Sequence, residues 1–284
     1  MTTVTYLGPA GTFTEAALIA MADRGEIDPA GPDAVTAEPV DSPRAALAAV
    51  RRGDADFACV AIENSVDGPV TPTYDALTAG PELQIYREVE IGVEFSILVR
   101  PGTDPADVRS FTTHPVAYPQ VREWVDANLP GVEVHHATSN AAAAHLVADV
   151  RGARTRFVLV GRPGTPTPRT GTDRTSVSFT LDNTPGTLMQ AMNEFAVRDI
   201  NLSRIESRPT RTTLGTYRFH IDVAGHIDDP VVGSALAALY RRAENLRFLG
   251  SWPAAHGTAI LEDGPPDVAA ALGWVEKLKQ GERD

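Results

Sequence analysis

A run of proline and glycine divides this 284-residue sequence into two parts. The run extends from Gly161 to Gly171 and reads Gly-Arg-Pro-Gly-Thr-Pro-Thr-Pro-Arg-Thr-Gly. Proline removes a backbone donor and clashes with the preceding helical turn, so neither a helix nor a central strand can continue through this run. We therefore predict a linker here, and the chain is long enough to form two ordinary domains around it.

The part before the linker alternates short apolar strands with amphipathic helices, which predicts an α/β class with parallel sheets. The expected strands are Thr3–Leu7, Val35–Val40, Asp56–Ile62, Leu83–Val99, Ser110–Thr113, Val132–His136 and Arg156–Val160. One expected helix begins at Phe13. The others cover Pro43–Arg52, Pro115–Asn128 and Asn140–Val150. The extended segment Leu83–Val99 is long enough to pass from one lobe to another.

The part after the linker has a different rhythm, which predicts a small βαββαβ domain of the ferredoxin-like type. Strands are expected at Thr175–Leu181, Asn201–Thr210, Leu214–Val223 and Asn245–Trp252, and helices at Thr187–Val197 and Pro230–Ala243. A peripheral helix is expected at Asp267–Leu278.

Composition excludes several classes of function. The net charge of −12 argues against non-specific binding to nucleic acid or an anionic membrane. A single cysteine, Cys59, leaves no disulfide and no thiol cluster, and we expect a soluble cytoplasmic protein without a signal peptide. Neither a nucleotide-binding nor a metal-binding motif is present, so we expect no cofactor and no metal.

Small polar residues follow several of the expected strands. Gly8-Pro9-Ala10-Gly11 precedes Thr12, Glu63-Asn64-Ser65 follows a buried strand, and Thr112-Thr113 precedes His114. Each junction taken singly is typical of an ordinary turn or helix cap. Together, at the ends of strands where helix N-termini present free N–H groups, they favour a site for a small carboxylate bound by neutral donors.

As a set, these junctions resemble the signatures of prephenate dehydratases. The resemblance rests on Tyr6–Phe13, on Glu63-Asn64-Ser65 with its following Gly68 and Val70, and on Thr155-Arg156-Phe157. His114-Pro115 with Gln120 is similar to a further family motif, in which Thr113 replaces the usual serine.

The second part resembles the ACT domain attached to these enzymes. Gly186-Thr187-Leu188-Met189 stands where the family has Gly-Ala-Leu-Val, and Glu206-Ser207-Arg208-Pro209 matches the family motif without change.

The resemblance implies a bilobed catalytic domain similar to type II periplasmic binding proteins, with the active site between its lobes. The implied reaction converts prephenate to phenylpyruvate, with loss of water and carbon dioxide and without a cofactor. Thr155 would hydrogen-bond the departing hydroxyl, and Asn64, Thr113 and Gln120 would complete the catalytic set. The residues expected to bind substrate are Gly11, Thr12, Ser65 and Arg156.

The resemblance also implies regulation by L-phenylalanine, bound between ACT domains of a homodimer or homotetramer. The effector-binding residues would be Gly186, Thr187, Leu188, Met189, Asn201, Glu206, Ser207, Arg208 and Pro209. Arg208 has a second interpretation, as a member of a structural ion pair.

The implied domains are a catalytic domain at 1–161, a linker at 162–172, an ACT domain at 173–253 and a tail at 254–284. Lobe 1 would contain residues 1–80 and 155–161, and lobe 2 residues 81–154. Only Arg151-Gly152-Ala153-Arg154 separates the helix expected to end at Val150 from Thr155. Family members usually carry a further strand and helix there, so lobe 2 is short of one βα unit.

Three explanations of this shortage remain open. The sequence omits a stretch of the chain, the gene carries a tolerated deletion, or the protein is a catalytically weak relative that retains binding.

Two alternative functions remain open. One is an arogenate dehydratase, which uses the same chemistry on an amino substrate and which the motifs do not exclude. The other is a non-catalytic phenylalanine sensor, which the shortened lobe 2 favours.

Overall fold

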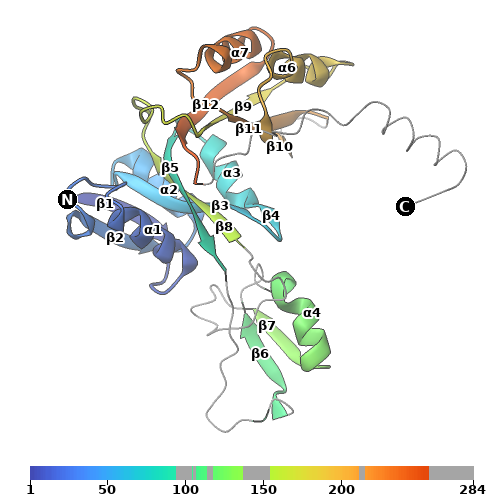
Figure 1. Cartoon of the computed structure of the whole chain (residues 1–284). Helices are drawn as coiled ribbons and strands as arrows, with labels where there is room; N and C mark the ends of the chain where they lie inside the picture. Colours follow the sequence, from blue (N-terminus) through green and yellow to red (C-terminus); the bar gives the residue numbers. More distant parts are fainter. Residues whose placement is uncertain (94–103, 105–106, 114–117, 137–153, 211–214, 256–284) are drawn as a thin grey trace, which may run out of the picture.

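The structure is a computed structural model that describes residues 1–93, 104, 107–113, 118–136, 154–210 and 215–255. Its elements form three sheets, of six, four and two strands (Figure 1). The helix expected at Asn140–Val150 and the tail helix at Asp267–Leu278 lie outside the described residues.

The six-stranded sheet has the order β2-β1-β3-β8-β5, with the short β4 paired to β3. Its strands are β1 (Thr2–Leu7), β2 (Val35–Val40), β3 (Phe57–Asn64), β4 (Gly68–Pro69), β5 (Gln84–Gly92) and β8 (Arg154–Gly161). The helices packed on it are α1 (Phe13–Asp23), α2 (Pro43–Arg52) and α3 (Thr71–Thr78), and a 3-10 turn, η1, covers Pro32–Ala34.

Local sequence sets the bounds of α2 within this sheet-and-helix unit. The Ser42 hydroxyl accepts a hydrogen bond from the Ala45 N–H at 3.1 Å, and Pro43 occupies the first helical turn. Gly53 ends the helix at a φ of 85°, a conformation that glycine adopts without steric cost. The buried face of α2 then packs through Leu47 and Val50 onto the core of the sheet.

Two strands, the short β4 and the central β8, run against the others, which corrects the expectation of a parallel sheet. β1 pairs in parallel with both β2 and β3, whereas β8 is antiparallel to both β3 and β5. The reason is the path of the chain. β5 leads out of the sheet toward the segment that contains β6, and β8 brings the chain back between β3 and β5.

The outlying segment contains β6 (Ser110–Thr113), α4 (Tyr118–Asn128) and β7 (Glu133–His136). β6 and β7 pair in parallel, and α4 packs against them through Val121 and Val125, with Leu129 directly after the helix in the same cluster. Figure 1 shows this unit beyond the ends of β5 and β8, on the side away from the four-stranded sheet.

The four-stranded antiparallel sheet follows residues 162–172, which form neither helix nor strand. Its order is β10-β11-β9-β12, and two helices cover one face. The elements are β9 (Asp173–Thr180), α6 (Thr187–Ala196), β10 (Leu202–Pro209), β11 (Tyr217–Ala224), α7 (Pro230–Tyr240) and β12 (Glu244–Pro253).

The two large sheets share one apolar core. Leu249 and Trp252 of β12 are buried in the same cluster as Ile85 of β5 and Val160 of β8. Gly250 permits this contact, because a Cβ atom built there would lie 2.3 Å from the Ile85 carbonyl oxygen. The four-stranded sheet is therefore packed directly on the edge strand of the six-stranded one.

No helix in the described part of the chain is long and apolar enough to cross a membrane.

Candidate active site and effector pocket

Asn64 and Thr155 meet at the point where β8 enters the six-stranded sheet. They are cross-strand partners at the end of the β3–β8 ladder. The Asn64 amide Nδ2 donates to the Thr155 Oγ1 at 2.8 Å, and both side chains are buried. Two residues 91 positions apart in the sequence are thus brought into one polar pair.

The turn after β3 fixes the direction of this hydrogen bond. The Asn64 Oδ1 accepts from the backbone N–H groups of Val66 at 2.8 Å and Asp67 at 3.2 Å. The amide NH2 group must therefore point the other way, toward Thr155. Because the Thr155 oxygen accepts from Asn64, its own hydroxyl proton is directed to a further acceptor.

Ser65 fastens the start of β8 beside this pair. Its backbone N–H donates to the Arg154 carbonyl oxygen at 2.9 Å, and its hydroxyl accepts from the Arg154 N–H at 2.9 Å. The Ser65 side chain thus holds the backbone immediately before Thr155.

The turn after β1 is held by Glu15 of α1. Thr12 caps this helix by accepting from the Glu15 N–H at 3.3 Å, and the Glu15 carboxylate accepts from the Gly11 N–H at 2.6 Å. The Tyr6 hydroxyl donates to the same carboxylate at 2.9 Å. Burial, and then this bond to Glu15, raise the pKa of Tyr6 to about 12. Gly11 and Thr12 therefore form a rigid helix entrance in which Glu15 already accepts from the Gly11 N–H.

Arg156 does not lie where a substrate carboxylate was expected, and here the expectation is corrected. Its side chain emerges from β8 on the face opposite to Thr155, since neighbouring strand residues alternate. The guanidinium lies 2.8 Å from Glu63, 3.0 Å from Asp222 and 3.2 Å from Glu88. Burial alone would lower its pKa, but Asp222 and Glu88 outweigh it and the pKa is raised. Three carboxylates of the protein thus take the place of the substrate.

The remaining expected catalytic residues lie in the outlying segment. Thr113 is the last residue of β6 and is buried, and Gln120 lies on α4. His114 and Pro115 lie outside the described residues.

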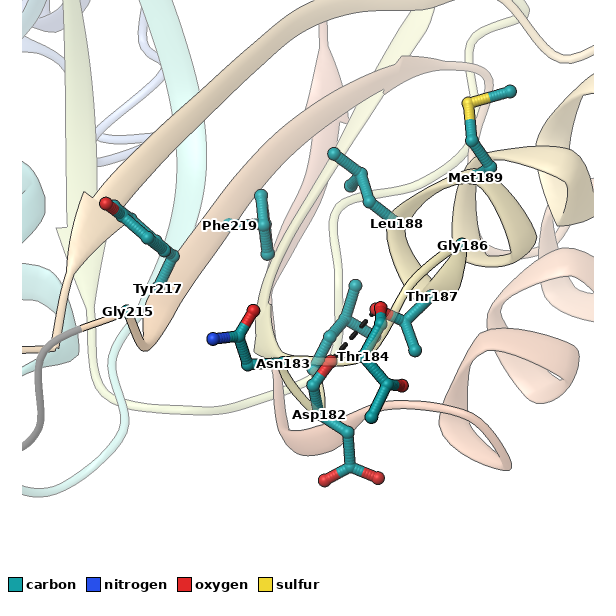
Figure 2. A pocket seen from close by; sticks show the side chains of 11 residues that line it. Asp182, Asn183, Thr184, Gly186, Thr187, Leu188, Met189, Gly215, Tyr217 and Phe219 are labelled. Atoms are coloured by element: carbon teal, nitrogen blue, oxygen red, sulfur yellow. Dashed lines mark hydrogen bonds between the residues drawn. The ribbon is translucent and has the colours of Figure 1, made fainter.

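A hollow of about 220 Å³ opens at the N-terminus of α6 (Figure 2). Gly186, with a φ of 85°, begins the helix, and the Thr187 hydroxyl donates to the carbonyl oxygens of Asp182 at 2.9 Å and Thr184 at 3.0 Å. Leu188, Met189, Tyr217 and Phe219 supply apolar walls. All four residues of the expected Gly-Thr-Leu-Met motif line this hollow.

The other expected effector residues lie elsewhere in the chain. Asn201 precedes β10, and its carbonyl oxygen accepts from the Ala224 N–H at 2.9 Å. Glu206, Ser207, Arg208 and Pro209 are on β10, at the edge of the sheet, and none of them lines the hollow in Figure 2. The Arg208 guanidinium lies 3.4 Å from Asp75 of α3, so its alternative interpretation as an ion-pair member is observed.

Sequence reasoning missed a buried charge network between the two large sheets. Asp222 of β11 accepts from Arg204 and Arg156, both at 3.0 Å, and is 1% exposed. Glu88 of β5 accepts from the Trp252 indole N–H at 2.8 Å and from the Ala255 N–H at 2.8 Å. Charged residues inside apolar strands, such as Asp222 between Ile221 and Val223, were the available signal.

Among the described residues, no group of three or more His, Cys, Asp or Glu side chains is arranged to hold a metal ion. Cys59 is fully buried in β3, and burial raises the pKa of its thiol.

Comparisons with known proteins agree over almost the whole chain. A model of the family described as prephenate dehydratase matches residues 4–155. A prephenate dehydratase of Mycolicibacterium vanbaalenii is 53% identical, with 98% of each chain covered. One from Mycobacterium tuberculosis is 49% identical, over 99% of this chain and 95% of its own. A crystal structure of the Arthrobacter aurescens prephenate dehydratase in complex with L-Phe superimposes with a TM-score of 0.80. It is 38% identical and covers 98% of this chain and 99% of its own.

The alignment with the Mycolicibacterium protein extends over 310 positions, more than the 284 residues of this chain. That relative therefore carries residues with no counterpart here.

Proposed function

The chain belongs to the prephenate dehydratase family, and from that premise we propose that Thr155 donates a hydrogen bond to the departing hydroxyl in conversion of prephenate to phenylpyruvate. The observation that carries this role is the 2.8 Å hydrogen bond from Asn64 to the Thr155 hydroxyl. It directs the O–H of Thr155 away from Asn64, so that it can donate a hydrogen bond to substrate. The reaction makes the protein a carbon–oxygen lyase.

The chemistry requires assistance at one atom. As the ring carboxylate departs as carbon dioxide, its bonding electrons enter the ring and expel the ring hydroxyl, and the ring becomes aromatic. Hydroxide is a poor leaving group, so a donor at that oxygen lowers the barrier as negative charge develops there. The Thr155 hydroxyl is suited to this role, because the Asn64 NH2 group that holds it can donate a hydrogen bond but cannot accept one.

The surrounding residues would orient substrate from two sides. Thr113 and Gln120 would reach it from the outlying segment, and the backbone near Gly11 and Thr12 from the end of β1. Ser65 would act by holding the strand that carries Thr155. This division corresponds to two lobes of the type II periplasmic-binding-protein kind with substrate between them, in a cytoplasmic enzyme.

The test is a pair of substitutions at Thr155. Thr155→Val removes the hydroxyl with little change in volume, and we expect kcat to fall by about 100-fold or more. Thr155→Ser retains the hydroxyl and is expected to keep most of the activity. The measurement is phenylpyruvate formation from prephenate.

Thr5→Val is the matched control. Thr5 is also a buried strand threonine, and its hydroxyl donates only to backbone carbonyl oxygens, at 3.2 Å from Ala46 and 3.3 Å from Phe57. A melting temperature no lower than that of Thr5→Val would show that Thr155→Val is folded. Near-native turnover by that folded variant would contradict the role proposed for the Thr155 hydroxyl.

We further propose that residues 173–253 are an ACT domain that binds L-phenylalanine between two copies of the chain. The apolar hollow in Figure 2 is of a size for a side chain, and Met189 at its rim is 73% exposed. The Glu206–Pro209 motif lies on the edge strand β10, so a second copy is needed to bring it to this hollow. The Arthrobacter relative, solved with L-Phe, supports the choice of ligand.

Isothermal calorimetry with L-phenylalanine tests this proposal, together with the molar mass in solution. Saturable binding by a dimer or tetramer is expected, and Gly186→Val is expected to abolish it by straining the start of α6. Absence of saturable binding by the folded wild-type protein would contradict it.

One observation favours a second candidate function. The alignment with the Mycolicibacterium relative is longer than this chain, as expected if lobe 2 is incomplete. A chain with an incomplete lobe 2 would bind L-phenylalanine without turning over prephenate, and so act as a sensor. Assay of the purified protein on prephenate and on arogenate, with and without L-phenylalanine, separates the three possibilities. Prephenate turnover that L-phenylalanine suppresses is the expected result.

A further inference from the structure

A second hollow is lined by several arginines. It lies between the helices α2 and α3 on one side and the four-stranded sheet on the other. Its volume is about 720 Å³. One wall comes from Arg44 of α2 and the α3 residues around Asp75, and the other from Arg208 of β10 with Arg218 and His220 of β11. None of these residues belongs to the proposed catalytic set, and only Arg208 belongs to the motif proposed for the effector.

Positive charge predominates around this hollow. Asp75 is the single carboxylate among its described lining residues. Its side chain is 39% exposed, and it lies 3.4 Å from Arg208. Glu206 lies on the neighbouring strand opposite His220 and does not line the hollow. Three arginines and one carboxylate thus line the hollow, in a protein whose net charge is −12.

Two further arginines, Arg204 and Arg247, lie close enough to act on the residues that line this hollow. Burial, and then the positive charge of Arg247, lower the pKa of Arg218. Burial, and then Arg204 and Arg218, lower the pKa of His220 to about 3, so its ring is neutral at neutral pH.

Buried polar atoms at this hollow lack partners within the described part of the chain. His220 is 1% exposed, and its Nδ1 makes no hydrogen bond to any described residue. The same holds for the Nε of Arg208. Both atoms are enclosed behind the surface of the hollow, so an anion bound there would contact the arginines that line it and would act on these buried groups through its charge.

We propose that this hollow binds a small anion with at least two negative charges, a phosphate or a dicarboxylate, through Arg44 and Arg218, beside the Arg208–Asp75 pair. Planar guanidinium groups are suited to either anion, because each presents paired N–H donors to paired oxygens. The threonine hydroxyls of Thr71, Thr78 and Thr210 also line the hollow. Since its walls come from both sheets' elements, the bound anion would hold α2 and α3 against β10 and β11.

Calorimetry on the full chain with inorganic phosphate and with malonate tests this site, with sodium chloride at matched ionic strength as the reference. We expect saturable binding of at least one probe, weakened roughly tenfold or more by Arg44→Gln or Arg218→Gln. Phosphate alone would assign the phosphate class, and malonate alone the dicarboxylate class.

Arg241→Gln is the matched control, because Arg241 is an exposed arginine at the end of α7, away from the hollow. It is expected to bind like the wild type. Arg44 is also exposed, so its variant reports on binding even if Arg218→Gln folds poorly. Heats equal to those of chloride, or undiminished affinity in Arg44→Gln, would overturn the proposal.

Discussion

Asn64 and Thr155 illustrate what a single residue's identity can and cannot indicate. Both could be selected from the sequence because they occur in motifs at the ends of strands. Their mutual contact, and the direction of the hydrogen bond between them, required the fold, because the direction depends on the N–H groups of Val66 and Asp67. The sequence therefore predicted the participants, and the structure adds the polarity of their interaction.

Asn64→Asp tests that polarity. An aspartate can still accept from Val66 and Asp67, so the turn after β3 is expected to remain intact. The carboxylate, however, would accept a hydrogen bond from the Thr155 hydroxyl instead of donating one to its oxygen. The Thr155 O–H would then no longer be available to the substrate. We expect kcat to fall by about 100-fold or more while the melting temperature changes little, as followed by phenylpyruvate formation and thermal denaturation. Unchanged kcat would show that the direction of this bond is irrelevant to turnover.

Asp222 is the residue whose ionisation the fold depends on most directly. Burial opposes its charged form, but Arg204 and Arg156 outweigh burial and hold its pKa well below the usual value. Asp222→Asn leaves these arginines without their shared carboxylate, and we expect a loss of about 3–5 kcal/mol in the free energy of unfolding at pH 7. Urea denaturation measures this loss.

The pH dependence of that loss follows from the sign of the shift. A depressed carboxyl pKa stabilises the folded state above the unfolded pKa of about 3.9, and the contribution fades as the pH falls toward the folded value. The difference between wild type and Asp222→Asn should therefore narrow below about pH 4. Asp54→Asn, which breaks an exposed pair with Arg52, is the control and is expected to cost less than about 1 kcal/mol. A constant difference down to pH 3 would contradict the account.

At the scale of elements, strand and helix bounds were the most predictable feature. Val35–Val40, Pro43–Arg52 and Ser110–Thr113 coincide with β2, α2 and β6. At α2, Ser42-Pro43 before the helix and Gly53 after it account for this agreement. Local rules are sufficient where both ends of an element carry their own signal.

The helix α3 and the direction of β8 are among the element-scale features that were not predicted. The helix α3 is short, and only its Pro72 near the start distinguishes Thr71–Thr78 from a loop. The antiparallel direction of β8 was missed because it depends on where the chain goes between β5 and β8. An apolar strand has the same residue pattern in either direction when both its faces are buried.

The contact of β12 with β5 gives a test at this scale. Gly250 has a φ of 134°, and an added Cβ would lie 2.3 Å from the Ile85 carbonyl oxygen. Gly250→Ala should therefore separate the two strands and lower the free energy of unfolding by about 1–3 kcal/mol beyond the backbone term. Gly171→Ala is the control, because Gly171 has a φ of 93° with no atom within 4 Å of the added Cβ. Equal losses in the two variants, by urea denaturation, would show that the close approach has no energetic consequence.

At the scale of the whole molecule, an ion pair between β8 and β11 connects the proposed active site with the proposed effector pocket. Thr155 and Arg156 are neighbours on β8, and Arg156 pairs with Asp222 of β11. β11 also carries Tyr217 and Phe219, which line the hollow in Figure 2. No local sequence pattern could have predicted this route, because each of its charge pairs joins residues more than 60 positions apart.

Trp252→Phe tests whether this route transmits inhibition. The substitution keeps an aromatic ring in the core but removes the indole N–H that donates to Glu88 at 2.8 Å. Glu88 retains Arg156 and Arg174 at 3.2 and 3.3 Å, so the fold should survive with a loss of about 1–3 kcal/mol. If the proposed regulation operates through this junction, prephenate turnover without effector should persist, while the L-phenylalanine concentration for half-inhibition rises above the Kd measured by calorimetry. Inhibition that still follows binding as closely as in the wild type would show that the signal travels by another route.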